Sequence, residues 1–294
     1  MTVPDLELVR RWRPPGALDV AVVLGVHQRG AHDPAYRRAP DGSVWRASHT
    51  PDGPGTVAVT ADAGEVVGRA WGAGAAWLLD RLPAMLGADD DPASLPLDSP
   101  AVARLAARAG GLRIGRTDRV WEALVPAVME QKVVSAEAYR GWRHLLRRYG
   151  EPAPGPCDLR VPPPRARWRE ITEADWHRSG LEPVRMRIIR NAAAVDVETK
   201  AGVLTALRGI GPWTAAHARS RALGDADAVP YGDYHVPSIV GQTLIGEPVD
   251  DAGMAELLAP YAGHRYRVIR MCELYGVRPP RRGPRRPVRD YREF

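Results

Sequence analysis

Cysteine is nearly absent from this sequence of 294 residues, and so are phenylalanine and lysine. The two cysteines, Cys157 and Cys272, are too few for a zinc site of four thiolates or for an iron–sulfur cluster. No run of about 18 apolar residues occurs, which excludes a transmembrane helix. Residues 1–15 have no apolar segment after their basic residues, unlike a secretory signal. These absences predict a cytoplasmic protein, in which a disulfide is not expected.

Basic residues outnumber acidic ones by 41 to 35, which gives a formal net charge of +6. Nearly all of them are arginine, because lysine occurs only at Lys132 and Lys200. A basic balance favours an anionic partner, and nucleic acid is the commonest one. The planar fork of arginine also suits phosphate, to which it donates two parallel hydrogen bonds. A genome-wide codon bias toward arginine explains the composition at least as well, so the charge alone does not decide.

The first 72 residues have the composition of strands and turns. Segments 43–50 and 55–72 are rich in β-branched and aromatic residues and are punctuated by glycine and aspartate. Segment 74–87 changes to a helical period. Residues 89–100 are acidic and rich in proline, which is typical of a connection between domains. We therefore expect an N-terminal α+β domain over residues 1–95.

From residue 101 onward the pattern is helical. Segment 117–150 predicts two helices, and Pro126 in the first of them implies a kink or a late helix start. Segment 151–168 predicts a long proline-rich loop. Helical periods return at 171–180 and at 183–195.

The sequence thus predicts a mainly α protein in which a helical domain over residues 96–276 follows the α+β domain. The tail, 277–294, is rich in proline and arginine. Such a tail either follows DNA phosphates as a polybasic arm or is a solvated end, the usual state of these segments. We find no internal repeat.

The most informative segment is VLTALRGIGPWTAAHARSRA, residues 203–222. Val203, Leu204 and Leu207 are spaced for the buried face of a helix. Two glycines interrupt that helix, and Pro212 then stands where proline is favoured, at the first position of a new helix. We predict a helix, a Gly-x-Gly turn and a second helix.

Gly209 and Gly211 permit positive φ angles and close approach by another backbone. The free amides at the start of the second helix then point outward together, an arrangement that binds phosphate oxygens without reading the base sequence. The alternative is a tight turn that only reverses the chain. In a basic, helical protein we favour the DNA interpretation for this segment.

Three aspartates follow the hairpin. Asp225 and Asp227 lie in a turn-like segment, where aspartate commonly accepts a hydrogen bond from its own backbone. Asp233 precedes a predicted helix and suits a helix cap, where the helix dipole and amides keep a carboxylate ionised. An ionised carboxylate also stabilises the oxocarbenium-like transition state of glycosidic bond cleavage. The cap and the catalytic interpretations are compatible.

The segment LRGIGPWTA (207–215), followed by Asp233 in DYHV, resembles the helix-hairpin-helix DNA glycosylase superfamily. The resemblance is greatest to bacterial 3-methyladenine DNA glycosylases of the AlkA type. Segments 111–142 and 183–193 also resemble that group, and the similarity extends over roughly residues 105–276. The resemblance implies a helix-hairpin-helix DNA glycosylase fold.

The resemblance also implies roles for the hairpin and its surroundings. The hairpin binds DNA phosphate through Gly209, Ile210, Gly211 and Thr214. Family hairpins often hold a monovalent cation on backbone carbonyls, here those of Leu207 and Gly209. No metal site of side chains is expected, because His235 and His264 lack partner ligands at suitable spacing.

Further roles concern the reaction. Asp233 takes the place of the catalytic aspartate. Trp213 stands where members that also cleave the backbone have a nucleophilic lysine, and without an amine no Schiff base forms. Gln131 and Lys132 fall in the segment that enters the gap left by the flipped base. A lysine departs from the apolar wedge of related enzymes, although its stem fills some space.

The remaining aromatic and histidine residues give a candidate base pocket. Trp213 and Tyr234 flank Asp233 and present electron-rich faces to a cationic purine. Core packing is an equally good interpretation for Trp213, and helical spacing favours the core for Trp121. His264 replaces an expected pocket aromatic. The expected pocket residues are Trp213, Tyr234, His217, His264 and Trp121.

Together these features predict a monofunctional DNA glycosylase that flips and hydrolytically excises alkylated purines in base excision repair. Its expected partner is double-stranded DNA with damaged bases. We expect a monomer, with no cofactor and no membrane association, that is associated with the nucleoid while acting. Two alternatives stay open: a non-catalytic helix-hairpin-helix DNA-binding protein, and a glycosylase for deaminated bases.

Overall fold

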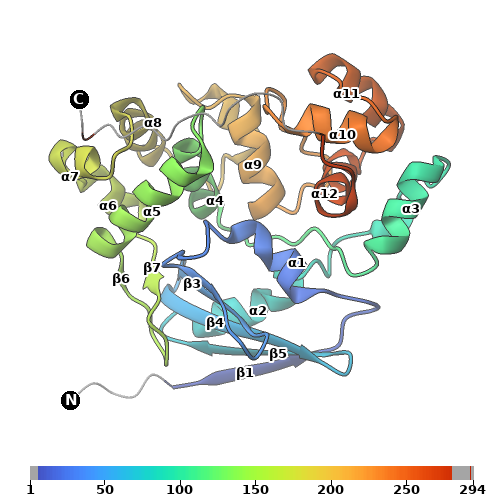
Figure 1. The fold of residues 1–294 in the computed structure, drawn as a ribbon. Helices are drawn as coiled ribbons and strands as arrows, with labels where there is room; N and C mark the ends of the chain where they lie inside the picture. Colours follow the sequence, from blue (N-terminus) through green and yellow to red (C-terminus); the bar gives the residue numbers. More distant parts are fainter. Residues whose placement is uncertain (1–5, 280–291, 293–294) are drawn as a thin grey trace.

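A body of helices lies against a small antiparallel sheet in the computed structural model, which describes residues 6–279 and residue 292 (Figure 1). The strands are β1 (Leu8–Trp12), β2 (Tyr36–Arg38), β3 (Val44–Thr50), β4 (Gly53–Asp62), β5 (Glu65–Trp71), β6 (Glu151–Pro152) and β7 (Arg160–Val161). The α-helices are α1 (Val20–Leu24), α2 (Ala75–Met85), α3 (Pro100–Arg108), α4 (Val120–Met129), α5 (Ser135–Tyr149), α6 (Arg165–Glu170), α7 (Glu173–Arg178), α8 (Pro183–Ala193), α9 (Pro212–Ala222), α10 (Val236–Leu244), α11 (Asp251–Leu258) and α12 (Arg265–Tyr275). The 3₁₀ helices are η1 (Gly25–His27), η2 (Pro92–Ser94), η3 (Ala201–Ala206) and η4 (Ala259–Tyr261).

The N-terminal sheet has the strand order β1-β5-β4-β3-β2, and all neighbouring strands are antiparallel. The strands expected over 43–50 and 55–72 are confirmed, with the second segment divided into β4 and β5. The division falls at Ala63 and Gly64, which both have positive φ, as a two-residue hairpin turn requires. Helix α2 confirms the helical period at 74–87 and packs on β4 and β5. The α+β character of the N-terminal region is thus confirmed.

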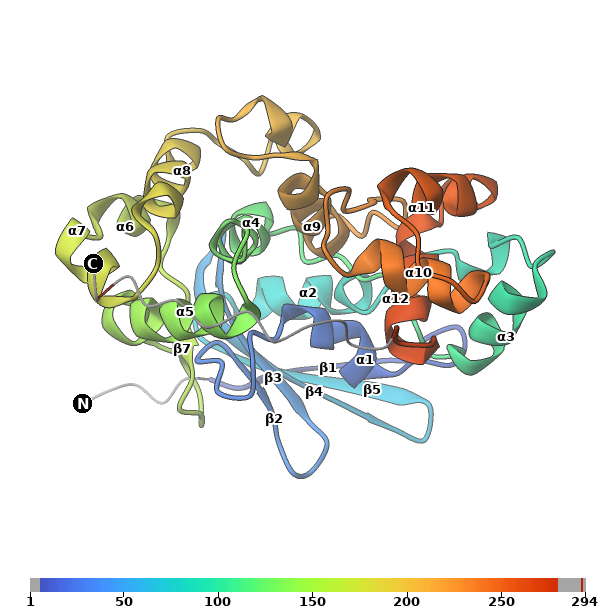
Figure 2. The same ribbon diagram turned by 45° about the horizontal axis from the view of Figure 1, so that its top comes forward.

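The N-terminal region has a hydrophobic core of its own. Its buried members lie between Val20 and Leu86. The helical body contains two further clusters, one around α4, α8 and α9 and one around α3, α10, α11 and α12. Helix α9 lies between α4 and α8 on one side and α10 to α12 on the other (Figures 1 and 2). The domain limits at 95 and 276 stay predictions.

Most of the expected helices are confirmed, with two corrections. Helices α4 and α5 fill segment 117–150, and α4 already begins at Val120, so the late start suggested by Pro126 is wrong. The helix expected before the hairpin is the 3₁₀ helix η3. Val203 there has non-helical angles and is 57% exposed, so it does not belong to a buried face. Of Val203, Leu204 and Leu207, which were expected to form a buried face, only Leu204 is fully buried, at 2% exposed.

Within residues 6–279 and 292, no helix has the length and apolar character needed to span a bilayer. Cys157 and Cys272 are both free thiols. Of the predicted tail, residues 280–291 and 293–294 lie outside the described residues.

Candidate active site

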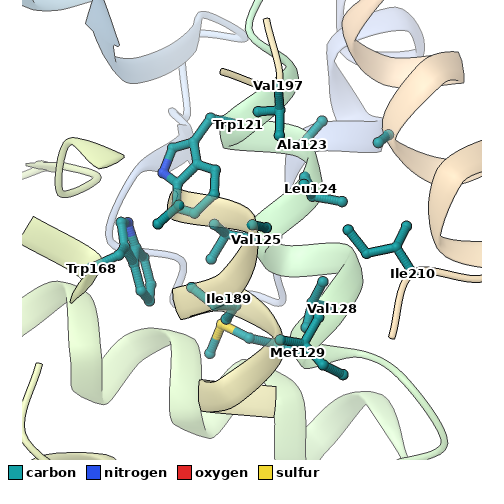
Figure 3. Packing of buried hydrophobic residues seen from close by; sticks show 14 of the residues in the cluster. Trp121, Ala123, Leu124, Val125, Val128, Met129, Trp168, Ile189, Val197 and Ile210 are labelled. Carbon is teal, nitrogen blue, oxygen red and sulfur yellow. The ribbon is translucent and has the colours of Figure 1, made fainter. Parts of the chain in front are cut away.

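The hairpin turn places Gly209 in the left-handed region. Its φ is +88°, and a Cβ atom built there would lie 2.5 Å from Cγ1 of Ile188. The turn is closed by the Ile210 amide, which donates to the Leu207 carbonyl at 3.0 Å. Ile210 itself is 3% exposed and points from the hairpin toward α4 (Figure 3). Backbone conformation and packing therefore both require glycine at position 209.

The second glycine has another role than the one expected. Gly211 has φ −89° and ψ −179°, an extended conformation open to any residue, so the expected positive φ is wrong for this position. It caps α9, and Pro212 occupies the first helical position as predicted. A Cβ atom at Gly211 would meet nothing within 4 Å. The protein thus leaves open space beside this backbone.

The amides around the start of α9 are unused. Within the described part of the chain, the N–H groups of Gly209, Gly211, Trp213 and Thr214 donate to no protein acceptor. Such orphan donors, together with the positive end of the helix dipole, suit an anion. Thr214 as a whole is 2% exposed, and its Oγ1 already accepts from Gln131, so the expected DNA contact of this residue stays a prediction.

Gln131 is turned toward the hairpin. Its side-chain amide donates to the Gly209 carbonyl and to Oγ1 of Thr214, both at 2.9 Å. Its own carbonyl accepts a hydrogen bond from Arg185, which is 3% exposed and pairs with Glu182 at 2.8 Å. Gln131 therefore braces the loop between α4 and α5 against the hairpin. Arg185 was not foreseen, because it is one of three arginines in α8 and nothing in the sequence distinguishes it from the other two.

Lys132 stands at the tip of this braced loop. It is exposed and has a φ of +53°, which is uncommon for a residue with a side chain. On its N-terminal side, Arg29 forms an ion pair with Glu130 at 2.9 Å. The backbone before Lys132 is thus held from two sides by buried arginines.

The carbonyls expected to hold a cation are already acceptors. The Leu207 carbonyl accepts from Ile210, and the Gly209 carbonyl accepts from Gln131. Each oxygen has two lone pairs, so one remains on each. The expected cation site on these two carbonyls stays a prediction. Among the described residues, no group of three or more His, Cys, Asp or Glu side chains could hold a metal ion.

Asp233 is fixed by three hydrogen bonds. Its Oδ1 accepts from the amides of His235 at 2.8 Å and Val236 at 3.0 Å, at the start of α10. Its Oδ2 accepts from the indole N–H of Trp213 at 2.8 Å. The carboxylate that follows the hairpin is thus joined directly to the helix that begins at the hairpin.

The backbone before Asp233 is held as well. Gly232 has a φ of +87°, and its amide donates to Asp251 at 2.9 Å. The next residue, Tyr234, is 87% exposed and contacts His235 edge to face. Tyr234 therefore stands beside Asp233 as an exposed aromatic ring.

A polar group lies behind Trp213 on the same face of α9. The rings of Trp213 and His217 are 4.2 Å apart, and Nδ1 of His217 contacts the guanidinium of Arg221. Burial lowers the pKa of His217 well below its usual value, and the positive charges of Arg221, Arg29 and Arg270 lower it further. Arginine has no acceptor, so Nδ1 accepts and Nε2 carries the proton. This Nε2 is buried and has no hydrogen-bond partner within the part of the chain described.

Two expected pocket residues lie elsewhere. Trp121 is 4% exposed and packs among Val197, Val125 and Trp168 in the core, so its assignment to the pocket is wrong (Figure 3). Helices α5, α8 and α9 pack against α4, whose apolar residues are almost entirely buried.

The second of these residues, His264, has both ring nitrogens occupied. Nε2 lies 3.0 Å from Oγ of Ser94, and Nδ1 accepts from Arg267 at 3.1 Å. No contact joins it to Asp233 among the described residues. Its contacts fasten the start of α12 to the segment before α3.

The other two aspartates are structural, as their turn-like segment suggested. Asp225 accepts from the Asp227 amide at 2.9 Å and pairs with Arg219. Asp227 accepts from the Gly263 amide at 2.8 Å and from Nε of Arg265 at 2.7 Å. Their carboxylate oxygens accept hydrogen bonds from backbone amides and pair with arginines.

No protein-family model and no curated protein sequence matches the chain. Solved structures do match. The 3-methyladenine DNA glycosylase from Archaeoglobus fulgidus gives a TM-score of 0.77 at 19% identity, covering 90% of this chain and 97% of its own. The apo form of Clostridium acetobutylicum 8-oxoguanine glycosylase/lyase gives 0.70 at 12% identity, covering 93% and 99%. The latter protein in complex with double-stranded DNA gives 0.69 at 12% identity, covering 91% and 97%.

This chain has the helix-hairpin-helix DNA glycosylase fold. The fold expected from the hairpin and the downstream aspartate is confirmed. Identities of 12% and 19% establish a common fold, and the chemistry of this chain has to be argued from its own residues.

Proposed function

We propose that this protein is a monofunctional DNA glycosylase that excises alkylated purines of the 3-methyladenine type from double-stranded DNA. One observation carries the proposal. The Asp233 carboxylate is held by the indole of Trp213, and Trp213 belongs to the first turn of the helix that the hairpin starts. A protein that only binds phosphate has no need of a fixed carboxylate beside its binding site.

The hairpin supplies binding. The unused amides of Gly209, Gly211 and Trp213 surround the N-terminus of α9, where a phosphate oxygen can accept from them. Contacts of this kind fix the position of the duplex without reading its sequence. A base inside a duplex is out of reach of any side chain, so it must be turned out of the stack before reaction.

Asp233 supplies the chemistry. A carboxylate has about four lone-pair positions, two on each oxygen. In Asp233, hydrogen bonds from the protein occupy both positions of Oδ1 and one position of Oδ2. One position on Oδ2 is left for the sugar or for water. As the bond between C1′ and the base nitrogen breaks, its electrons leave with the base and positive charge develops on the sugar. The carboxylate stabilises that charge, water forms the new bond to C1′, and the water proton passes to the carboxylate or to solvent.

The leaving group explains the proposed substrate. A purine alkylated on a ring nitrogen is already cationic and needs no strong general acid. The rings of Trp213 and Tyr234 present electron-rich faces, and Tyr234 is exposed. Trp213 offers no amine, so a Schiff base with the sugar cannot form at this position and the strand stays intact.

A second candidate is excision of a deaminated base, and one observation favours it. The neutral His217 presents a buried N–H without an acceptor behind Trp213, next to the cationic Arg221. A carbonyl oxygen on a purine or pyrimidine would satisfy that N–H, whereas a cationic base would be repelled by Arg221. The two candidates share Asp233 and differ in the base that enters.

The experiment incubates the protein with three DNAs: methylated DNA, DNA containing hypoxanthine and DNA containing uracil. Released bases are then separated by chromatography. Release of 3-methyladenine or 7-methylguanine supports the proposed function, and release of hypoxanthine or uracil alone supports the second candidate. Binding to DNA without release of any base supports the non-catalytic alternative. Strand cleavage without added base or heat would contradict the monofunctional assignment.

A further inference from the structure

A groove with only basic side chains runs along the outer face of α5. It measures about 600 Å³. These residues recur at every turn of the helix, on one face. In both views α5 lies on the other side of α4 from the group α10 to α12 (Figures 1 and 2). The groove is lined by Arg140, Arg143, His144, Arg147 and Arg148.

Little negative charge balances this groove. Asp175 of α7 is one neighbouring carboxylate, and it pairs with Arg148 at 2.8 Å and with Arg178 at 2.7 Å. Within residues 6–279 and 292, no carboxylate pairs with Arg143 or Arg147. The guanidinium groups of these two arginines are therefore available for an anion.

His144 gives a second, independent sign of a missing partner. Its Nε2 is buried and makes no hydrogen bond in the described chain. Burial lowers the pKa of His144, and Arg148, Arg292 and Arg178 lower it further, against the opposing effect of Asp175. A buried polar atom without a partner costs free energy, which a ligand in the groove would recover.

We propose that the α5 groove binds the phosphodiester backbone of DNA, outside the stretch of duplex that the hairpin holds. Arginine forks match phosphate oxygens in pairs, and phosphate contacts need no apolar neighbours. A protein partner would be expected to bury hydrophobic residues at its centre, whereas every residue that lines this groove is basic. The chemistry of the lining residues thus favours nucleic acid over an acidic protein.

The position of α5 supports this ligand. The helix begins four residues after Gln131, the residue that braces the hairpin at Gly209. Its 15 residues extend about 22 Å, at roughly 1.5 Å per residue. Arg143 and Arg147, four residues apart, then offer two cations about 6 Å apart along the helix to a strand that carries one phosphate about every 3.4 Å of duplex axis. The proposal rests on the proposed function, because it takes DNA to be the partner.

The test compares DNA binding by the wild type and by the double variant Arg143→Gln/Arg147→Gln. The control Arg38→Gln/Arg104→Gln removes the same charge from two exposed arginines on β2 and α3. Affinity for an undamaged duplex is measured over a series of salt concentrations. Loss of two phosphate contacts should reduce the slope of log K against log salt by about 1.8, and the control should leave the slope unchanged.

The possible outcomes separate this proposal from the proposed function. If the wild type binds DNA and the α5 variant keeps its slope, the groove proposal is wrong and the glycosylase proposal stands. If the wild type does not bind DNA at all, both fail. If poly-glutamate binding depends on Arg143 and Arg147 while the DNA slope does not, the groove serves an acidic protein instead. At saturating DNA the α5 variant should release base at the wild-type rate, and a lost rate would also overturn the proposal.

Discussion

The hairpin and the loop of Asp233 each lie at the start of a helix, and they use it in opposite ways. At α9 the first amides have no acceptor in the described chain. At α10 the amides of His235 and Val236 are both taken by Asp233. An open helix start attracts an external anion, whereas a filled one fixes an internal anion. Binding and chemistry are therefore assigned to different helix ends and should be separable by mutation.

The largest expected effect is the loss of base release when Asp233, at the start of α10, is substituted. Asp233→Asn removes the negative charge and gives Trp213 a group that also donates. Loss of such preorganised charge stabilisation typically lowers the rate on the order of 100-fold or more. DNA affinity should persist or rise slightly, because repulsion between the carboxylate and phosphate is gone. Single-turnover base release and a binding titration measure the two effects.

Asp225→Asn is the matched control for that experiment. Asp225 lies nearby in sequence, and its contacts are with the Asp227 amide and Arg219. This variant should release base at close to the wild-type rate. Equal losses in both variants would contradict the assignment of catalysis to Asp233.

The next effect is on DNA affinity and is expected for a substitution at the start of α9. Gly211→Val places its side chain in free space at an ordinary backbone conformation, so the fold should be unaffected. The side chain would keep a phosphate from the amides beside it, and hydrogen bonds to a charged group are worth about 1.5–3 kcal/mol each. We expect affinity for any duplex to fall on the order of ten-fold, whatever its sequence. Normal binding by a normally folded variant would leave the hairpin as a turn only.

Gly209→Val sharpens the same comparison. Its φ of +88° and the contact with Ile188 make any side chain unfavourable there. Strain and overpacking of this kind cost about 1–3 kcal/mol each. Thermal unfolding should detect this loss in the variant at position 209 and not in that at position 211.

The sequence allowed prediction of the features that local residues determine. Pro212 at a helix start, Gly209 in a left-handed turn and Asp233 at a helix cap each act within a few residues of themselves. The strands β3, β4 and β5 likewise follow from composition and turn residues. Together with the resemblance to helix-hairpin-helix glycosylases, these features supported the prediction of the fold class and of the candidate catalytic residue.

Contacts between distant segments were not predictable. Gln131 meets Gly209 across 78 positions, and no local pattern specifies that pair. For Trp121 helical spacing favoured the core over the pocket, and only the packing of distant residues such as Trp168 and Val197 decides between them. Arg221 could have been found, because it lies eight residues after Trp213 and four after His217, on one face of α9.

An effect of similar size, but on the rate, is expected for Trp213, which links the two helix starts. Trp213→Phe keeps an aromatic ring beside His217 and removes the indole N–H that donates to Asp233. Asp233 keeps its two backbone donors and gains freedom at Oδ2. We expect base release to fall about ten-fold, consistent with one lost hydrogen bond to a charged group. DNA affinity should be unchanged, and a loss of affinity as large as the loss of rate would show that Trp213 acts in binding.

The smallest effect is expected for Gln131→Ala, which tests what Gln131 does. The resemblance places this residue in the gap left by the flipped base, whereas in the structure its amide donates to Gly209 and Thr214. If bracing is its role, the variant loses about 1–2 kcal/mol of stability for two hydrogen bonds and keeps most of its rate of base release. The midpoint of thermal unfolding measures the first quantity and single-turnover release the second.

Gln131→Glu is the informative companion, because it keeps the shape and replaces the donor by an oxygen facing the Gly209 carbonyl. This variant should therefore be less stable than the alanine variant. Unchanged stability with a large loss of base release would instead assign Gln131 to the gap in the duplex.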